Sequence, residues 1–342
     1  MRGEQIEERS LTYAQALNEA LREEMQRDAR VILLGEDIGV WGGGGVFGVT
    51  KGLLEEFGAE RVRDTPISEA GFTGAGLGAA LAGLRPVVEF MYVDFSMLAM
   101  DQICNQAAKI RWMLGGDVSV PLVIRAQQGA GRGNGPQHSQ SLEAWYAHTP
   151  GLKVVMPSTP YDAKGLLKTA IRDDNPVVFL EHKLLYGTRG PVPKEDYTIP
   201  FGQAAIVRQG RHVTCVALSY QVHKALEAAD VLAEEGIELE IIDPRTLVPY
   251  DRETVARSIM KTGRLLVTHQ APERAGFAAE VVMCALEDAF DYFDAPPLRV
   301  CGKNVPIPYS LTLEAAAIPQ TEDLVRAAKR LVEGVPLGGR RS

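Results

Sequence analysis

One glutamate, Glu69, stands at the entrance to a run of very small residues. It closes the segment DTPISE (residues 64–69), and glycines and alanines dominate residues 70–83. Such a backbone can press closely against another backbone, so an acid beside it is expected to be buried. Burial raises the pKa of an unpaired carboxyl group, which lets a glutamate hold or share a proton near neutral pH. The competing interpretation is a helix cap formed by Ser68 and Glu69 beside a packing helix.

The same glycines imitate a dinucleotide-binding fingerprint. Gly74, Gly76 and Ala79 have the required spacing, and Asp94 follows at roughly the expected 20 residues. That fingerprint must follow a hydrophobic strand, whereas polar residues precede it here and the strand-like run 86–93 comes afterwards. NAD binding is therefore disfavoured, and a small-residue helix that packs against a second subunit explains the glycines better.

Two further loops carry groups that could do chemistry. Glu36 follows the apolar run 31–34, and His138 follows the glycine-rich segment 129–135. Active sites of α/β sheets gather in the loops after the strands, and a flexible loop can close over a ligand. The alternatives are a solvated loop acid for Glu36 and a surface histidine for His138.

Composition limits the classes of partner. The chain has 342 residues, a net charge of −8 and four scattered cysteines. The negative charge disfavours nucleic acid, and no apolar run is long enough to span a membrane. The N-terminal residues 1–5 lack a signal-peptide core, the only basic cluster is Arg340-Arg341, and the cysteines read as free thiols, so we expect a cytoplasmic protein.

Short apolar strands alternate with helical patterns along most of the chain. This rhythm predicts parallel, doubly wound sheets, hence the α/β class with two domains. A Pro/Gly-rich, charged stretch interrupts it. We therefore expect a first domain over residues 1–186, a linker over 187–203 and a second domain over 204–342.

Several common motifs are missing from the sequence. It contains no P-loop, no G-x-S-x-G nucleophile elbow and no zinc-ligand spacing. The G-D-G motif of thiamine diphosphate sites is also absent. Residue patterns alone thus indicate two α/β domains, a buried glutamate and a histidine loop, without a complete cofactor site.

A series of ordered segments carries a family resemblance. The segments are GED (35–37), DTPISE (64–69), GLRP (83–86), QHSQ (137–140), PGLKVV (150–155), DAKGLL (162–167), IRD (171–173), NP (175–176), DPRT (243–246) and PIPY (306–309). From about residue 11 to 331 the chain resembles the β subunit of the decarboxylating component of 2-oxo acid dehydrogenase complexes.

This resemblance implies a fold, a cofactor and partners. The fold would be a thiamine-pyrimidine-binding domain followed by a transketolase C-terminal domain. The active unit would be a heterotetramer of two α and two β subunits, which shares thiamine diphosphate between the chains. The α subunit would hold Mg²⁺ and the diphosphate, which would explain the missing G-D-G. A lipoyl-bearing acyltransferase would receive the acyl group.

The resemblance also assigns roles to single residues. Glu69 matches the glutamate that hydrogen-bonds the pyrimidine ring nitrogen, and Phe95 matches an aromatic residue stacked on that ring. Glu36 and Ile67 are expected to contact the cofactor as well. His138 matches the histidine that assists acyl transfer to lipoamide.

A potassium site is implied by similarity to some relatives. Its residues would be Leu122, Ala170, Ile171, Asp173 and Asn175, which supply mainly carbonyl oxygens. In one place the chain departs from the family: Gln270 stands where many relatives have an acid.

The substrate is left open by the resemblance. Residues 46–53, 121–125 and 181–186 look most like acetoin dehydrogenase β subunits, whereas pyruvate and branched-chain enzymes share most other segments. A non-catalytic scaffold subunit is one alternative, which the joint presence of Glu69, Phe95 and His138 disfavours. A self-sufficient transketolase-like enzyme is another, which the missing G-D-G disfavours.

Overall fold

The computed structural model describes residues 9–39 and 43–334. Residues 1–5 and the Arg340-Arg341 pair, both noted in the sequence, lie outside the described residues, and so does Gly42. The chain forms two compact units. The first unit comprises residues 1–129, 145–201 and 246–249, and the second comprises 130–144, 202–245 and 250–342.

The first unit is built on a seven-stranded sheet with the order β12-β6-β7-β5-β4-β2-β3. Its strands are β2 (Val31–Gly35), β3 (Val62–Asp64), β4 (Arg85–Phe90), β5 (Val123–Gln128), β6 (Lys153–Val155), β7 (Val177–His182) and β12 (Thr246–Val248). All neighbours are parallel except β12 and β6. Strands β2, β4, β5 and β7 are buried along their whole length, as expected for a parallel sheet covered on both faces.

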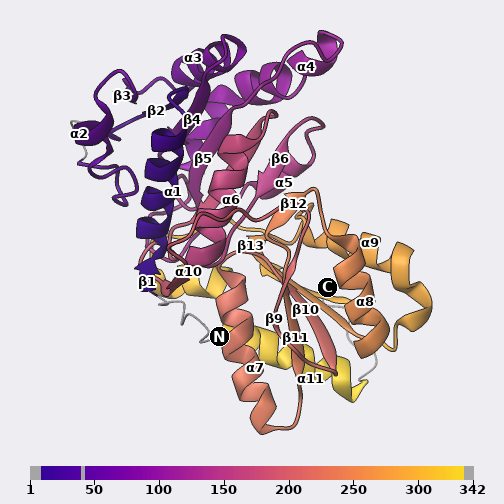
Figure 1. Cartoon of the computed structure of the whole chain (residues 1–342). Helices are drawn as coiled ribbons and strands as arrows, with labels where there is room; N and C mark the ends of the chain where they lie inside the picture. Colours follow the sequence, from indigo (N-terminus) through magenta and orange to yellow (C-terminus); the bar gives the residue numbers. More distant parts are fainter. Residues whose placement is uncertain (1–8, 40–42, 335–342) are drawn as a thin grey trace, which may run out of the picture. The chain divides into compact units, whose positions relative to one another are not determined.

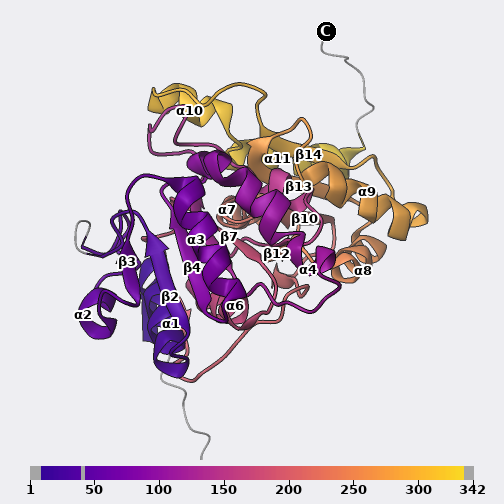
Figure 2. The same ribbon diagram turned by 90° about the horizontal axis from the view of Figure 1, so that it is seen from above.

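Helices and a small ribbon complete the first unit (Figures 1 and 2). The helical segments are α1 (Tyr13–Arg27), α2 (Leu53–Phe57), α3 (Glu69–Leu81), η1 (Val93–Ala99), η2 (Asp101–Ala107), α4 (Ile110–Met113) and α6 (Pro160–Arg172), and α5 (Glu143–Ala147) begins at the end of the second unit's segment 130–144. Strands β1 (Arg9–Thr12) and β8 (Arg189–Val192) pair antiparallel. A reciprocal capping box between Thr12 and Gln15 starts α1, which satisfies backbone groups that a helix end leaves open.

A charged network joins α1 to α6. Lys164 on α6 is fully buried, and its ammonium group lies 2.8 Å from the Glu23 carboxylate of α1. About two turns further along α6, Arg172 contacts the buried carboxylate of Glu24 at 2.6 Å. Buried charges are tolerated only when they are paired, so these pairs fix how the two helices lie against each other.

The second unit contains a five-stranded sheet with the order β14-β13-β10-β11-β9. Its strands are β9 (Ala205–Arg208), β10 (Val213–Ala217), β11 (Leu239–Asp243), β13 (Leu265–Pro272) and β14 (Leu298–Gly302), and its helices are α7 (Gln221–Glu234), α8 (Arg252–Thr262), α9 (Ala278–Ala289), η3 (Phe290–Tyr292), α10 (Leu311–Ala317) and α11 (Thr321–Glu333). Only β9 runs antiparallel. Figure 1 shows α7 with α11, and α8 with α9, on opposite sides of the strands.

Both units confirm the predicted α/β class. The core of the second unit joins apolar residues of β10, β11, α7 and α11, such as Val213, Ile241, Ala228 and Leu324. Among the described helices, none combines the length and apolar character needed to cross a membrane.

Residues 101–113 form the π-helix η2 and the short helix α4, which a turn at residues 108–109 separates. One local expectation differs from the structure. The stretch 187–203, expected to be a linker, contains strand β8. This strand pairs with β1, although the paired residues lie about 180 positions apart in the chain. The proposed limits 1–186, 187–203 and 204–342 stay a prediction.

Candidate active site

Three neighbouring strands of the first unit deliver the candidate residues. Strands β4, β2 and β3 lie side by side and run parallel. Glu36 directly follows β2, Glu69 follows β3 by five residues, and Phe95 follows β4 by five residues. Because parallel strands end at the same edge of a sheet, the topology brings these three segments to one edge.

Glu36 is a buried acid, and one of its oxygens has no partner in the part of the chain that the structure describes. Its exposed fraction is 9%, and within the described residues Oε1 makes no hydrogen bond. Burial raises the pKa of Glu36 to about 7, and the negative charges of Glu69 and Asp37 add to the rise. The group therefore exchanges a proton near neutral pH, and the charge effect shows that Glu69 lies close to it.

Glu69 is the first residue of α3 and is only 6% exposed, so its predicted burial is confirmed. Ser68 occupies the N-cap position, yet its side chain makes no capping hydrogen bond. The alternative of a Ser68 cap thus lacks its defining contact. A Cβ at Gly76 would lie 2.6 Å from Cγ2 of Val88, which shows how closely α3 packs on β4 (Figure 2).

Two apolar side chains accompany the acids. Ile67, in the bend before α3, has 83% of its surface exposed. Phe95 is half-buried in η1, where its N–H donates to the carbonyl of Tyr92 at 3.0 Å. An exposed isoleucine beside buried carboxyl groups suits a site with both apolar and polar contacts.

A buried ion cluster on β4, β5 and β7 was not foreseen from the sequence. The guanidinium of Arg125 binds Glu181 through two hydrogen bonds of 2.6 and 2.8 Å, and Glu89 through one of 2.6 Å. Gln127 donates to Glu89 at 2.9 Å, and the Tyr186 hydroxyl donates to Glu181 at 2.6 Å. The signal was a charged residue inside each of three largely apolar strands.

This cluster holds more acidic groups than basic ones. Two carboxylates face one guanidinium, and all three residues are at most 4% exposed. Burial raises the pKa of Glu89, although Arg125 opposes the rise. The strand register places Glu89 opposite Gly35, the residue before Glu36, so the cluster borders the candidate site.

The residues expected around potassium gather near the end of α6. Ala170 and Ile171 lie in its last turn and Asp173 is its C-cap residue, whose N–H donates to the Ala170 carbonyl at 3.3 Å. The Asn175 amide donates to the Asp173 carboxylate at 2.9 Å. The Leu122 carbonyl accepts from the Val177 N–H at 2.9 Å. Lys153 forms an ion pair with Asp173, which supplies a positive charge there already.

His138 belongs to the second unit. The segment 130–144 packs with that unit, and His138 is half-buried in it. Gly131, Gly133 and Gly135 adopt positive φ values of 115°, 67° and 75°, a region that other residues rarely enter. A cavity of about 210 Å³ adjoins this segment and is lined by residues that include Ser139, whose buried hydroxyl has no partner within the described structure.

In the second unit, Gln270 stands where many relatives have an acid. The Gln270 side chain is 8% exposed, and its Oε1 accepts from the Ala130 N–H at 2.6 Å. The preceding residue, His269, is fully buried, and burial lowers the pKa of its imidazole to about 4. Its Nδ1 lies 3.7 Å from the carboxylate of Glu143. A glutamine at 270 thus makes a backbone contact that needs no charge.

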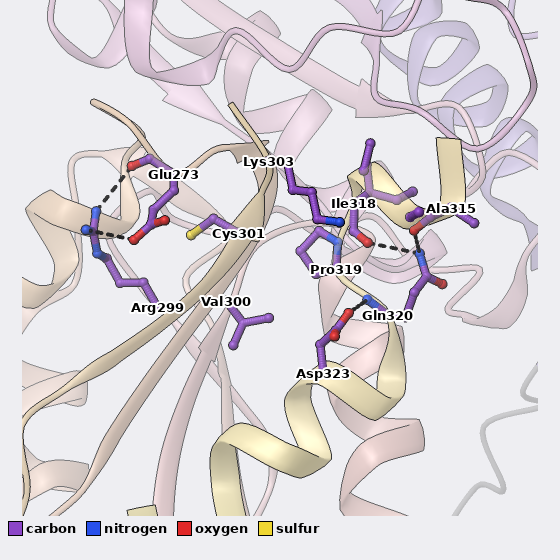
Figure 3. Close-up of a pocket in the computed structure, with 12 residues that line it drawn as sticks. Glu273, Arg299, Val300, Cys301, Lys303, Ala315, Ile318, Pro319, Gln320 and Asp323 are labelled. Carbon is purple, nitrogen blue, oxygen red and sulfur yellow. Dashed lines mark hydrogen bonds and ion pairs between the residues drawn. The ribbon is translucent and has the colours of Figure 1, made fainter. Parts of the chain in front are cut away.

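A larger cavity of about 450 Å³ lies between β14 and the segment that leads into α11 (Figure 3). Several of its polar groups contact one another. The Glu273 carboxylate pairs with Arg299 at 3.2 Å, and the Asp323 carboxylate accepts from the Gln320 N–H at 2.9 Å. Throughout the described residues, no three His, Cys, Asp or Glu side chains are grouped to hold a metal ion.

Comparison with known families accounts for both units. Residues 9–189 match the pyrimidine-binding domain of transketolase, and residues 202–324 match the transketolase C-terminal domain. A rice protein, "Pyruvate dehydrogenase E1 component subunit beta-2, mitochondrial", is 50% identical over 326 residues, which cover 94% of this chain and 86% of the relative. The chain belongs to the β-subunit family of pyruvate and acetoin dehydrogenases.

Bacterial members of this β-subunit family are equally similar. The β subunit of acetoin:2,6-dichlorophenolindophenol oxidoreductase from Cupriavidus necator is 49% identical, with coverage of 95% of this chain and 98% of the relative. The pyruvate dehydrogenase E1 β subunit of Rickettsia conorii is also 49% identical, with coverage of 94% and 98%. These near-equal identities to pyruvate and acetoin enzymes do not separate the two substrates.

A solved structure shares the fold. "Split gene transketolase, inactive beta4 tetramer" matches with a TM-score of 0.76 and 22% identity, covering 94% of this chain and 99% of that chain. The expected transketolase-like architecture is thereby confirmed. The family match also confirms that the chain is a relative of thiamine-dependent enzymes.

Proposed function

We propose that the chain is the β half of a thiamine diphosphate-dependent dehydrogenase component, active only with an α subunit. Its complex would cleave acetoin, or decarboxylate pyruvate, and pass the acyl group to lipoamide on an acyltransferase. The observation that carries the proposal is the pair of buried acids Glu36 and Glu69 at one edge of a pyrimidine-binding domain.

The residues at this edge fit an aminopyrimidine. Such a ring offers N–H groups and a basic nitrogen, and Glu36 has a buried oxygen to which no group of the described residues donates. Glu69 would share a proton with the ring nitrogen, and Phe95 and Ile67 would contact the ring's apolar surface. When bound, thiamine diphosphate supplies the carbon nucleophile that attacks the substrate carbonyl. The protein's part is to hold the ring and to keep a proton available at the Glu69 carboxyl.

His138 would act in the second half of the reaction. Its imidazole can deliver a proton to a sulfur atom of the lipoyl group as the acyl group is transferred. The glycines before it allow the loop an unusual path, which suits a residue that meets an incoming partner.

Metal ions enter the proposal in two places. Mg²⁺ would be held by the α subunit together with the diphosphate. K⁺ would be bound by carbonyl oxygens near the end of α6, where Ala170, Ile171 and the Asp173–Asn175 turn come together.

The test is reconstitution. The purified chain, given thiamine diphosphate, Mg²⁺ and either acetoin or pyruvate, should show no turnover. Addition of the α partner should restore activity, and the preferred substrate should be the one with the higher kcat/KM. Turnover by the chain alone would overturn the proposal. An assembled complex that turns over neither acetoin nor pyruvate nor a branched-chain 2-oxo acid would also overturn it.

A further inference from the structure

A buried glutamate on α10 accepts hydrogen bonds from the loop that precedes His138. Glu314 is 1% exposed, and its two carboxylate oxygens accept hydrogen bonds from the N–H groups of Gly131 and Gly133, each at 2.8 Å. Hydrogen bonds to an ionised carboxylate are roughly twice as strong as those between neutral groups. A single side chain therefore fixes two alternate peptide units of a segment whose glycines would otherwise move freely.

Gln270 on β13 holds the start of the same loop. Its Oε1 accepts from the Ala130 N–H at 2.6 Å, and its Nε2 donates weakly to the Ala130 carbonyl at 3.5 Å. Tyr309 lies against the loop's far end, since a Cβ placed on Gly135 would come within 2.3 Å of the tyrosine ring. The loop is thus held at residues 130, 131 and 133, and is packed at residue 135.

We propose that Glu314 and Gln270 are positioning residues that fix this loop and, through it, the place of His138. The inference rests on the role proposed for His138 in acyl transfer. Neither residue needs to touch the substrate. A histidine displaced by about 1 Å from its working position can lose on the order of 100-fold in rate, so loss of the grip should act mainly on the step that uses His138.

The loop itself is examined first, by hydrogen exchange of peptides that cover residues 130–140 in the full-length chain. Glu314→Gln replaces one acceptor oxygen with an amide that cannot accept from a glycine N–H, so exchange should become about tenfold faster or more. Glu322→Gln makes the same change at an exposed site on α11 and should leave exchange unaltered. Unchanged exchange in a folded Glu314→Gln protein would overturn the inference while leaving the proposed function intact.

Gln270 offers a conservative pair of variants. Gln270→Glu keeps the oxygen that accepts from Ala130, whereas Gln270→Leu removes it. Protection of residues 130–133 should survive in the glutamate variant and fall in the leucine variant. If both variants exchange alike, Gln270 does not position the loop. This pair also serves if Glu314→Gln fails to fold.

The consequence for catalysis is measured in the enzyme assembled with its α partner. In Glu314→Gln, the kcat of lipoyl-domain acylation should fall about tenfold or more, while the Kd of thiamine diphosphate and the reduction of an artificial electron acceptor stay within about twofold. Adding His138→Ala to the Glu314→Gln variant should lower the kcat of acylation little further, because both changes remove the same function.

The controls separate this inference from the proposed function. If His138→Ala lowers acylation but Glu314→Gln, with a loosened loop, does not, the positioning role is wrong. If His138→Ala alone leaves acylation unchanged, the proposed role of His138 fails. Faster hydrogen exchange in Glu314→Gln would then still support the conclusion that Glu314 holds the loop. A general loss in every assay would mark Glu314 as a stabilising residue and overturn its assignment as a positioning residue.

Discussion

The negative charge of Glu69 raises the pKa of Glu36, although the two residues are 33 positions apart in the sequence. They come together because β2 and β3 are parallel neighbours that end at the same edge of the sheet. The ionised form of each acid is disfavoured by the charge of the other, so Glu36 holds its proton to a higher pH than an isolated glutamate does.

The first prediction concerns this pair in the isolated chain. Glu69→Gln removes one negative charge, so the pKa of Glu36 should fall below about 7. NMR titration of glutamate labelled with ¹³C at the side-chain carboxyl would follow it. An unchanged Glu36 titration in the variant would show that burial and Asp37 alone cause the shift.

The same shift predicts a pH-dependent stability. The folded pKa of Glu36 lies above the ordinary value of 4.5, so its contribution is fully present below pH 4.5 and is lost as the pH rises through about 7. Glu36→Gln should therefore raise Tm relative to the wild type at pH 8 but not at pH 4.5. The exposed Glu55→Gln variant is the control, and its Tm relative to the wild type should be the same at both pH values.

A third prediction tests Glu69 in the assembled enzyme. Glu69→Gln keeps the shape of the side chain but removes the carboxyl group that shares a proton with the pyrimidine. Hydrogen–deuterium exchange at C2 of bound thiamine diphosphate should slow by about 100-fold or more. Glu55→Gln should exchange at the wild-type rate. A wild-type rate in Glu69→Gln would show that another group handles this proton.

His138 allows the two half-reactions to be separated. In His138→Ala, reduction of an artificial electron acceptor should stay close to the wild-type level, whereas lipoyl-domain acylation should fall about 100-fold, because proton delivery to sulfur is lost. His148→Ala, at an exposed position of the first unit, is the matched control. Equal losses in both assays would make His138 a residue that positions the cofactor.

The buried cluster around Arg125 predicts a large effect on folding. Arg125→Met leaves Glu89 and Glu181 buried without their cation, which should cost about 3–5 kcal/mol in the free energy of unfolding. Loss of the cation favours the neutral form of the buried carboxyl groups, so the destabilisation should be smaller at pH 5 than at pH 8. Urea unfolding measures both effects. Arg257→Met, which breaks an exposed pair, should cost about 0–1 kcal/mol.

The sequence predicted those elements whose signal is local. The apolar run 31–34 became β2, because a short continuous apolar run is typical of a strand that is buried on both faces. The family resemblance named Glu36, Glu69, Phe95 and His138, and the strand order explains why the first three share one edge. Their catalytic roles stay predictions.

Partners far apart in the chain could not be predicted. Strand β8 exists because it pairs with β1, and no period in residues 187–203 shows that pairing. Glu89, Arg125 and Glu181 look like isolated charges in apolar runs, and only the sheet order β7-β5-β4 makes them one cluster. The contacts of Glu314 with Gly131 and Gly133 join positions more than 180 residues apart.

Strand β12 has a consequence for anyone who shortens this chain. It comes from residues 246–248, yet it covers the outer side of β6 in the sheet of the first unit. A fragment that stopped near residue 203 would leave β6 with a row of unpaired backbone N–H and C=O groups. Such an edge can recruit strands from other molecules. The fragment would then self-associate into aggregates, however well the rest of it folded.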